Sequence, residues 1–398
     1  MLVLIMKPRD ILVMTIKSTD SIERLRKLGF SGSYHADDVI FLLQKMNLKS
    51  TTNEEKEKLI QSGKKHYSQM IGDEQAPSKQ HLALYKQALE QGAERFARET
   101  TELANHLIAL INEPIVLVSL VRAGVPLGVC LKHAISDQGK TCYHYGISII
   151  RDRGIDKAAL EAIIQTHGAS GIVFVDGWTG KGAISRELNQ NILPDPRFRL
   201  STATMAPLVT LADVGGCAWL AASGDDWLIP SGVLGSVISG LISRSILQQD
   251  IPADAAINDC FNTENWHGCI EYLHLTPYDL SLQFVATIDS IRQKLATTKE
   301  AEWPEEKRQM QQQQVMAVIK DIQIKQNITN DNRIKTGIAE ATRAVLRRVP
   351  ELIMLREADN PDTLLLRHLA QQTETPICIA GDAIAPYHAI TIIKKIGK

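Results

Sequence analysis

The sequence predicts an α/β protein with an open, mainly parallel sheet, followed by a second and smaller α/β domain. Strand and helix patterns alternate from residue 78 to residue 175, which is typical of a parallel sheet with helices packed on it. A loop rich in glycine follows the third of these strands, at the edge where parallel sheets bind their ligands. A second, shorter alternation occupies residues 335–393 after a polar stretch.

The composition is that of an ordinary globular chain. The 398 residues include 44 Lys and Arg against 45 Asp and Glu, 44% are hydrophobic and 22% are charged. These values exclude wholesale disorder, and a net charge of -1 argues against coating nucleic acid by bulk charge. Because no apolar run approaches about 18 residues, no membrane partner is expected. The length predicts two or three domains.

The cysteines and the N-terminal residues indicate a cytoplasmic protein. The six thiols show no C-x-x-C spacing, so reduced cysteines fit better than a zinc ribbon or a disulfide framework. Residues 1–28 are interpreted as a loosely specified leader, with disorder left open. They lack the long apolar stretch and cleavage site of a secretory signal.

Local patterns place the elements of a first domain at 29–300. Ser78 is predicted to cap a long helix whose apolar residues recur every three or four positions as far as Leu110. Apolar runs of strand length and periodic helical stretches follow it in alternation. The predicted strands are 115–119, 143–150 and 171–175, and the predicted helices are 127–136 and 157–166.

The C-terminal part of the chain divides into a linker and a small domain. Residues 301–330 are polar, include the run QQQQ, and are predicted to form a helical linker. The domain at 331–398 is predicted to contain helices at 340–348 and 363–372 and strands at 352–355 and 376–379.

The run VDGWTGKG at 175–182 is the most informative segment. It joins the tip of a buried strand to a helix that begins near Ala183. Backbone N–H groups at a helix start bind anions, and glycines let a phosphate approach the backbone. Thr179 and Lys181 add a hydroxyl and a positive charge, and Asp176 is placed to meet a sugar hydroxyl or a metal-bound water. A strand-turn-helix without a ligand is the alternative interpretation.

Two further loops stand where the same fold would use them. The run SLVRAGVPLG at 119–128 follows the first strand and offers the Arg122 charge beside an open backbone. The run IIRDRGID at 149–156 follows the second strand and carries Arg151 and Arg153 on either side of Asp152, with Gly154 as a possible hinge. A solvated charged turn explains the second run equally well.

Together these loops resemble the type I phosphoribosyltransferases, because the pattern fits neither a Walker loop nor a dinucleotide fingerprint. The likeness is incomplete: Asp176 stands alone where the family usually has adjacent acids, and the loop is shorter. The resemblance implies a sheet of the type I phosphoribosyltransferase kind that binds phosphoribosyl pyrophosphate. The implied binding residues are Ala123, Gly124, Thr179, Gly180, Lys181, Gly182 and Ala183.

The implied chemistry is phosphoribosyl transfer to an unknown acceptor. The resemblance assigns Asp176, Arg122, Arg151 and Arg153 as catalytic residues that position the phosphates and stabilise departing pyrophosphate. Mg²⁺ would bridge the diphosphate and meet Asp176 through water, without a direct protein ligand. The candidates for an acceptor pocket are Asp213, Asp225 and Asp226, although a solvated loop explains these acids slightly better.

Across most of its length the chain resembles the StiP-type family of tellurite-resistance and stress gene neighbourhoods. The resemblance is carried by SGSY at 31–34 with DDV at 37–39, QSGKKHYS at 61–68, IIRDRG at 149–154, VDGWTGKG at 175–182, IPSG at 229–232 and SGLISR at 239–244. It implies a predicted phosphoribosyltransferase in a stress pathway. A regulator that binds phosphoribosyl pyrophosphate without turnover and acts through RNA is one alternative, and a homodimer is left open.

A cysteine protease is the other alternative, since some members of this family carry that label. A thiol protease needs a cysteine activated by a nearby histidine. Cys269 with His267, or Cys217, could supply the nucleophile, but a structural cysteine is the commoner fate of such residues.

The C-terminal segment resembles the pelota-type RNA-binding domain. The resemblance is carried by IKTGIAEATR at 334–343, LIMLREAD at 352–359 with Pro361, and the pair Thr375 and Pro376. Ala339 stands where the relatives have an Asn that contacts a base, so the resemblance favours phosphate contacts over sequence-specific recognition. A solvated amphipathic helix is the competing interpretation. The RNA candidates are Lys335, Gly337, Glu340, Arg343 and Arg347.

Overall fold

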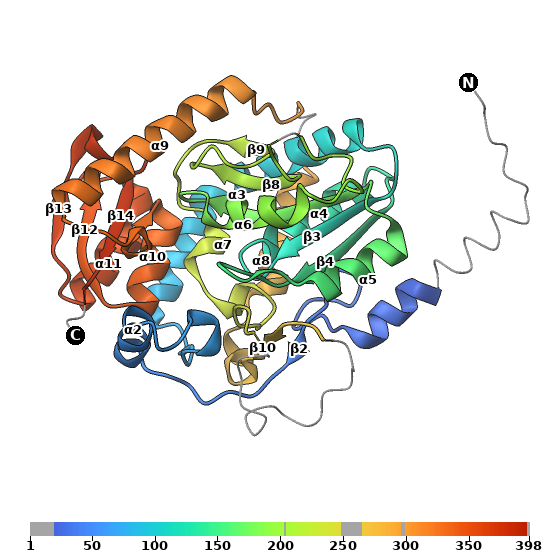
Figure 1. Ribbon diagram of the computed structural model, residues 1–398. Coiled ribbons are helices and arrows are strands. Elements are labelled where there is room, and N and C mark those ends of the chain that lie inside the picture. Colours follow the sequence, from blue (N-terminus) through green and yellow to red (C-terminus); the bar gives the residue numbers. More distant parts are fainter. Residues whose placement is uncertain (1–19, 203, 248–264, 296–298, 396–398) are drawn as a thin grey trace, which may run out of the picture.

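A computed structural model describes residues 20–202, 204–247, 265–295 and 299–395. In this part of the chain the first domain contains a six-stranded, fully parallel sheet in the order β1-β4-β3-β7-β8-β9 (Figure 1). The prediction of a mixed α/β protein with a mainly parallel sheet is therefore confirmed. The strands are β1 Ile40–Phe41, β3 Ile115–Leu120, β4 Cys142–Ile147, β7 Ile172–Thr179, β8 Leu208–Asp213 and β9 Leu220–Ser223.

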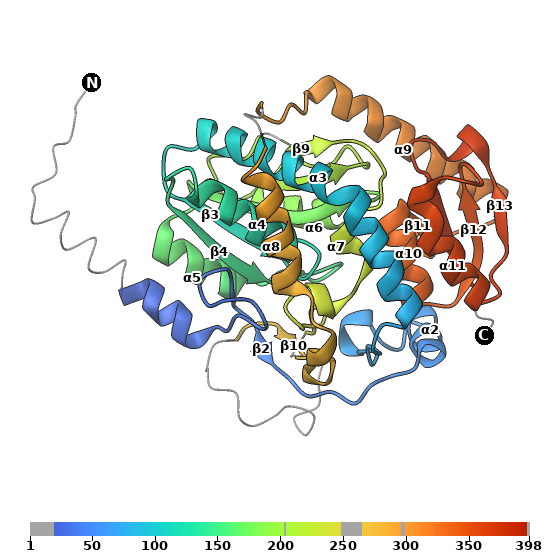
Figure 2. The ribbon, with the colours of Figure 1, turned by 180° about the vertical axis from the view of Figure 1, so that it is seen from behind.

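Helices cover both faces of this sheet. Successive residues of a strand point to opposite sides, and here the side chains on both sides are apolar. Ile115 and Leu117 face one apolar cluster, whereas Val116 and Val118 face the other. The first cluster lies under α3, α4 and α8 (Figure 2), and the second lies under α5 and α6. The helices are α3 Lys79–Leu110, α4 Val125–Ser136, α5 Lys157–His167, α6 Ala183–Ile192 and α8 Ser281–Arg292.

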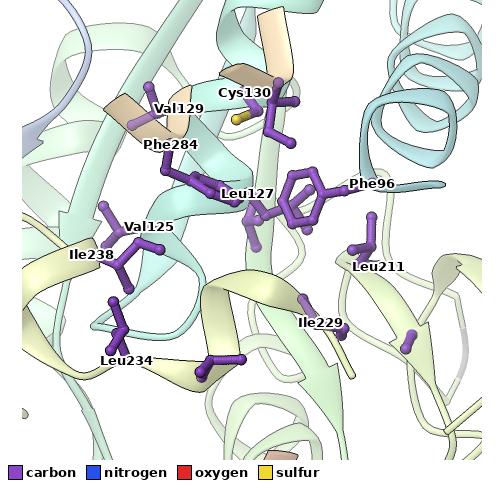
Figure 3. Packing of buried hydrophobic residues seen from close by; sticks show 14 of the residues in the cluster. Phe96, Val125, Leu127, Val129, Cys130, Leu211, Ile229, Leu234, Ile238 and Phe284 are labelled. Carbon is purple, nitrogen blue, oxygen red and sulfur yellow. The ribbon is translucent and has the colours of Figure 1, made fainter. Parts of the chain in front are cut away.

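The long helix α3 begins as the sequence predicts and anchors the larger cluster. The Ser78 side chain accepts a hydrogen bond of 3.1 Å from the backbone N–H of His81, which satisfies one free donor of the first turn. Figure 3 shows Phe96 of this helix against Phe284 of α8, with ring centroids 5.1 Å apart and planes at 87°. The stripe ends before its predicted last member, since Leu110 is 46% exposed.

Short elements surround the carboxyl edge of the sheet. One antiparallel pair of short strands consists of β5 Ile149–Ile150 and β6 Gly154–Ile155, and one parallel pair consists of β2 Gln44–Lys45 and β10 Gly268–Cys269. Two short helices, α2 Asn53–Gln61 and α7 Pro230–Val233, also lie at this edge.

The leader predicted at 1–28 is too long. Residues 20–28 form a helix, and Leu25, 3% exposed, packs into the cluster beneath α5 and α6. Leu28 packs against the same cluster, so an apolar pair three positions apart holds this helix on the sheet. The rest of the predicted leader, 1–19, lies outside the described residues.

The C-terminal domain is a four-stranded sheet in the order β11-β14-β12-β13 with two helices on it. The strands β12 and β13 run parallel, and the other two pairings are antiparallel. Its elements are β11 Ile334–Thr336, α10 Ile338–Arg347, β12 Pro350–Leu355, α11 Leu364–Gln372, β13 Ile377–Ile379 and β14 Ala389–Ile393.

The polar helix α9, Glu305–Lys325, packs on both domains and is not a free spacer. Its Val315 and Ile322 are buried in one cluster with strand residues of the C-terminal sheet. The Gln311 side chain donates to the backbone carbonyls of Val214 and Gly224 in the first domain. No helix of the described residues is both long and apolar enough to cross a membrane.

Asp226 joins the two domains at the start of α10. Its carboxylate accepts a 2.8 Å hydrogen bond from the backbone N–H of Ile338 and another of 2.8 Å from that of His388. The residue is 6% exposed, so these bonds lie away from water. They hold the first turn of α10 against the edge of the parallel sheet.

We expect Asp226→Ala to lower the free energy of unfolding by about 2 to 4 kcal/mol, because two buried N–H groups lose their acceptor. Asp225→Ala is the matched control. Its side chain is 68% exposed and pairs with Arg95, so its removal should cost at most about 1 kcal/mol. Urea unfolding of both variants measures the difference. Equal effects would contradict the role given to Asp226.

Candidate functional site

The candidate site is a cleft between the carboxyl edge of the parallel sheet and helix α10. A cavity of about 230 Å³ lies at the bottom of this cleft. The sequence-predicted residues Arg122, Arg151 and Asp176 line it together with the loop after β7, and so do Glu340 and Arg343 of α10. Residues predicted separately for phosphate and for RNA therefore form one site.

The C-terminal domain pins the glycine-rich loop. The hydroxyl of Tyr387 donates a 3.0 Å hydrogen bond to the carbonyl of Gly180. A Cβ at Gly180 would lie 2.7 Å from a carboxylate oxygen of Glu340, so no larger residue fits there without movement. Gly182 takes a left-handed φ of 74° and precedes α6 without a side-chain cap, which leaves the N–H groups of the first turn without a side-chain acceptor.

Two side chains of this loop have partners other than the predicted phosphate. The Thr179 hydroxyl donates a 2.5 Å hydrogen bond to Asp213 and accepts one from the N–H of Gly215. Lys181, 6% exposed, donates to the backbone carbonyls of Asp331 and Ile334. Thr179 thus stabilises the loop within the first domain, and Lys181 stabilises the contact of the loop with the C-terminal domain.

Asp176 lies within β7, three residues before the end of the strand, and lines the inner cavity. It accepts a 2.8 Å hydrogen bond from the N–H of Gly177, and burial raises its pKa to about 7. Arg343 and Glu340 are the charged side chains that act on it, in opposite directions. Asp176 therefore changes its ionisation close to neutral pH.

Arg122 reaches from the loop after β3 into the outer part of the cleft. Its guanidinium lies 2.7 Å from the carboxylate of Glu74 and 2.7 Å from the carbonyl of Ile242, while its buried Nε has no hydrogen-bond partner among the described residues. Although burial acts in the other direction, Arg122 and Arg347 hold the pKa of Glu74 at about 2. This carboxylate is a fixed negative charge between two guanidinium groups.

The predicted mobile basic loop is a tight β5–β6 hairpin. The backbone N–H of Arg151 donates to the Tyr67 hydroxyl at 2.7 Å, and the Arg151 guanidinium donates to Asn332 of the C-terminal domain. Arg153 is exposed at the rim. In this conformation the hairpin joins two parts of the cleft wall.

The residues predicted to contact RNA face inward. Arg343 lies with its guanidinium 4.8 Å from the ring centroid of Trp178, and Arg347 approaches Glu74 at 3.8 Å. Lys335 is 7% exposed and lies 3.7 Å from Glu340. Gly337 adopts a φ of 81° at the start of α10, next to Asp226. This surface faces the first domain across the cleft.

The three acids predicted for an acceptor pocket lie outside the cleft. Asp213 is fully buried and accepts from Thr179, from the backbone N–H groups of residues 217 and 218, and from the Trp303 indole. Asp225 is an exposed partner of Arg95, and Asp226 joins the domains. All three have structural partners, which a sequence pattern could not distinguish.

The outer part of the cleft, a cavity of about 1220 Å³ that adjoins the inner one, was not predicted from the sequence. Residues from α2 and the segment after it form one wall, including Lys56, His66 and Glu74. Arg244 and Arg348 complete it. Residues of this wall belong to the motifs at 61–68 and 239–244. These motifs indicated a family resemblance but were not interpreted as part of a binding site.

No thiol of the described cysteines hydrogen-bonds an imidazole. Cys269, proposed with His267, is fully buried in β10, and the His267 ring bonds Ser148 instead. Cys217 is partly exposed on the loop after β8, where its thiol donates to the carbonyl of Gly215 at 3.0 Å. Cys260 lies outside the described residues.

The fold and cleft define a two-domain α/β protein whose candidate site lies between the domains. Residues 32–289 match the family model described as tellurite-like stress resistance cysteine protease StiP, and residues 313–395 match the PELOTA RNA binding domain. The chain is 56% identical over 384 residues to the cysteine protease StiP of Acinetobacter baylyi, covering 96% of this chain and 99% of that protein. This chain belongs to the StiP family.

Similar solved structures add little to this assignment. A Trypanosoma cruzi hypoxanthine phosphoribosyltransferase complexed with IMP is 14% identical and has a TM-score of 0.21, covering 54% of this chain and 88% of that chain. An asparagine mutant of an invariant aspartic acid in HPRTs is 13% identical with a TM-score of 0.21, covering 49% and 92%. We transfer no property from either.

The comparisons contradict the predicted phosphoribosyltransferase function. The family and its 56% identical member are named as cysteine proteases, which are hydrolases and not transferases. The resemblances to the StiP-type family and to a pelota-type domain are confirmed. The error arose because a strand, a glycine-rich loop and a helix start form a general anion-binding arrangement that does not specify a reaction.

We expect Asp176→Asn to stabilise the protein at alkaline pH. The folded-state pKa of about 7 exceeds the value of about 4 in an unfolded chain, so stability falls as the pH rises between these values. The variant should unfold a few degrees above the wild type at pH 8, and this advantage should vanish near pH 4. Thermal unfolding across this range measures it.

The exposed Asp359→Asn is the control and should follow the wild-type curve. A pH dependence of Asp176→Asn identical to that of the wild type would show that the Asp176 carboxyl is not perturbed.

Proposed function

We propose that this chain is a cysteine protease that acts in stress resistance. The observation that carries the proposal is the 56% identity to a protein of that name over 96% of this chain and 99% of the relative. Since the likeness spans nearly all of both proteins, the two domains and the cleft between them belong to the shared architecture.

Cys217 is the nucleophile that we propose. The matched StiP region, 32–289, excludes Cys378, and within that region Cys130, Cys142 and Cys269 are buried. Cys217 lies at the carboxyl edge of the parallel sheet, where a Cβ on Gly182 would be 2.5 Å from its sulfur. Among the described cysteines of the region, it is the thiol that a peptide can reach with the least rearrangement.

The thiol of Cys217 needs activation. Burial, together with the nearby Asp213 carboxylate, raises its pKa to about 12, so it is protonated at neutral pH in this conformation. In peptide cleavage the sulfur would bond to the carbonyl carbon, the C–N bond would break, and the departing amine would take the proton. Water would then hydrolyse the thioester. The proton acceptor would have to come within hydrogen-bond distance by rearrangement.

Six single Cys→Ser variants and a fluorogenic peptide library test the proposal. We expect Cys217→Ser to lower kcat/KM at least about 100-fold, because a hydroxyl cannot replace the thiolate. Cys378→Ser and Cys142→Ser are matched controls and should retain activity. Iodoacetamide should abolish peptide cleavage by the wild type, and it should not lower the residual cleavage by Cys217→Ser any further.

Two results would overturn parts of the proposal. Loss of activity in Cys260→Ser with retention in Cys217→Ser would move the nucleophile outside the described residues. Peptide cleavage that is absent from the wild type, or that survives in all six variants, would rule out a cysteine protease.

We also propose a particular architecture for the sheet of the first domain and particular boundaries for the domains. The parallel strand order and the loop after β7 support a sheet of the type I phosphoribosyltransferase kind, as an architecture without the reaction. The boundaries 29–300, 301–330 and 331–398 are proposed with the qualification that α9 packs on the C-terminal sheet. RNA binding at Lys335, Arg343 and Arg347 would take place at the cleft, because these side chains line it.

Magnesium does not fit the residues of the cleft as a protein-held ion. Among the described residues no group of three His, Cys, Asp or Glu side chains could hold a metal. The cavity that contains Asp176 is lined by basic side chains, whose positive charge opposes the binding of a metal cation. We therefore derive no step through Mg²⁺.

A further inference from the structure

Basic side chains converge on the outer cavity from both domains. Among the described residues that line it, twelve are Lys or Arg and four are Asp or Glu. The total for the chain is nearly balanced, at 44 against 45, so this excess is local. The basic residues are Lys56, Lys64, Lys65, Arg122, Arg151, Arg153, Arg244, Arg333, Lys335, Arg343, Arg347 and Arg348.

The carboxylates near this cavity neutralise only part of its positive charge. Glu74 is shared by Arg122 and Arg347, and the buried Glu57 is engaged by Arg348 at 2.8 Å. Each acid is therefore already committed to the cleft wall.

Seven of the twelve cations have no ion pair with a described carboxylate, and three of these seven, on different walls, are Arg244, Arg343 and Lys56. The guanidinium of Arg244 donates to the backbone carbonyls of Tyr67 and Met70, which carry no net charge. Arg343 stacks on Trp178, and its buried Nε has no partner in the described part of the chain. Lys56 completes the set, on the opposite wall.

Burial and mutual repulsion both lower the pKa of basic groups in the cleft. Burial, with Arg151, Arg348 and Lys181 nearby, lowers the pKa of Lys335 to about 7. Burial and neighbouring guanidinium groups likewise lower the pKa of Arg343 to about 9. An anion bound among them would oppose both shifts, because an opposite charge favours the protonated form.

We propose that this cleft binds a small molecule with several phosphate groups, held by both domains at once. Planar guanidinium groups match phosphate oxygens in pairs, and five of the converging cations are arginines that also line the inner cavity, at 122, 151, 244, 343 and 347. A cavity of about 1220 Å³ suits a metabolite-sized ligand, and the basic face of α10 forms one of its walls. The proposal goes beyond proteolysis, and it implies no transfer reaction.

A ligand held in this way would stabilise the docked arrangement. It would join α10 to the opposite wall through Arg343 and Lys56, and it would offset the repulsion among the cations. The site is therefore placed to report a phosphorylated metabolite to the rest of the protein.

Titration calorimetry of the full chain with inorganic tripolyphosphate, pyrophosphate, phosphate and sulfate tests the proposal. We expect affinity to rise with the number of phosphate groups, and Arg343→Gln to weaken tripolyphosphate binding at least about tenfold. Lys56→Gln, on the other domain, should do the same. Arg356→Gln is the control, since Arg356 pairs with Asp382 outside the cavity and should bind like the wild type.

Circular dichroism of each variant separates loss of binding from loss of folding, and the two cleft variants lie in different domains for the same purpose. Equal binding of tripolyphosphate and sulfate, or an equal loss in Arg356→Gln, would overturn the proposal. Binding of a single-stranded RNA oligonucleotide that excludes tripolyphosphate and depends on Arg343 would overturn it in favour of RNA. Because no measurement uses peptide cleavage, failure here is distinguishable from failure of the protease proposal.

Discussion

The buried carboxylate of Asp226 is the contact on which the arrangement of this protein depends. A carboxylate taken out of water is costly unless hydrogen-bond donors replace the water, and here two backbone N–H groups of the C-terminal domain do so at 2.8 Å. These bonds set where α10 begins. Once its first turn is held there, the helix directs Arg343 and Arg347 toward the loop after β7. The cleft is a consequence of that placement.

The price of this placement is a concentration of positive charge that the wall compensates only in part. Glu74 remains ionised between Arg122 and Arg347, and Glu57 holds Arg348. Aromatic stacking on Trp178 supplies the remaining stabilisation of Arg343. Such a surface is stable while the domains are docked, and it favours a bound anion. Its excess of positive charge is local to one cavity, so it is compatible with a net charge of -1 for the whole chain.

The relation between this cleft and the proposed thiol is spatial. Cys217 follows β8, and its sulfur lies behind Gly182, on the loop that Tyr387 and Lys181 fasten to the C-terminal domain. Movement of that domain would therefore alter the surroundings of the thiol, which burial keeps protonated while the domains are docked. The two proposals share one loop but are tested by separate measurements.

Local patterns were sufficient for much of the fold. The alternation at 115–118 places side chains on two faces of a strand, and Ser78 caps its helix through its own side chain, so both follow from neighbours in sequence. A glycine-rich turn between a strand and a helix was also expected correctly, but β7 continues to Thr179, so only residues 180–182 of the predicted loop form that turn. The reaction could not be inferred from it, since many proteins bind anions at such loops.

What the sequence determined by itself was the order of elements, the two α/β regions and the loops at the strand ends. The tertiary structure decided the roles of single charged residues. Asp213, Asp225 and Asp226 lie within a short segment, yet one is a buried acceptor, one is exposed and one joins the domains. Their partners, such as Trp303, Ile338 and His388, are about 90 or more positions away. Burial and pairing across such separations depend on packing, which no local pattern records.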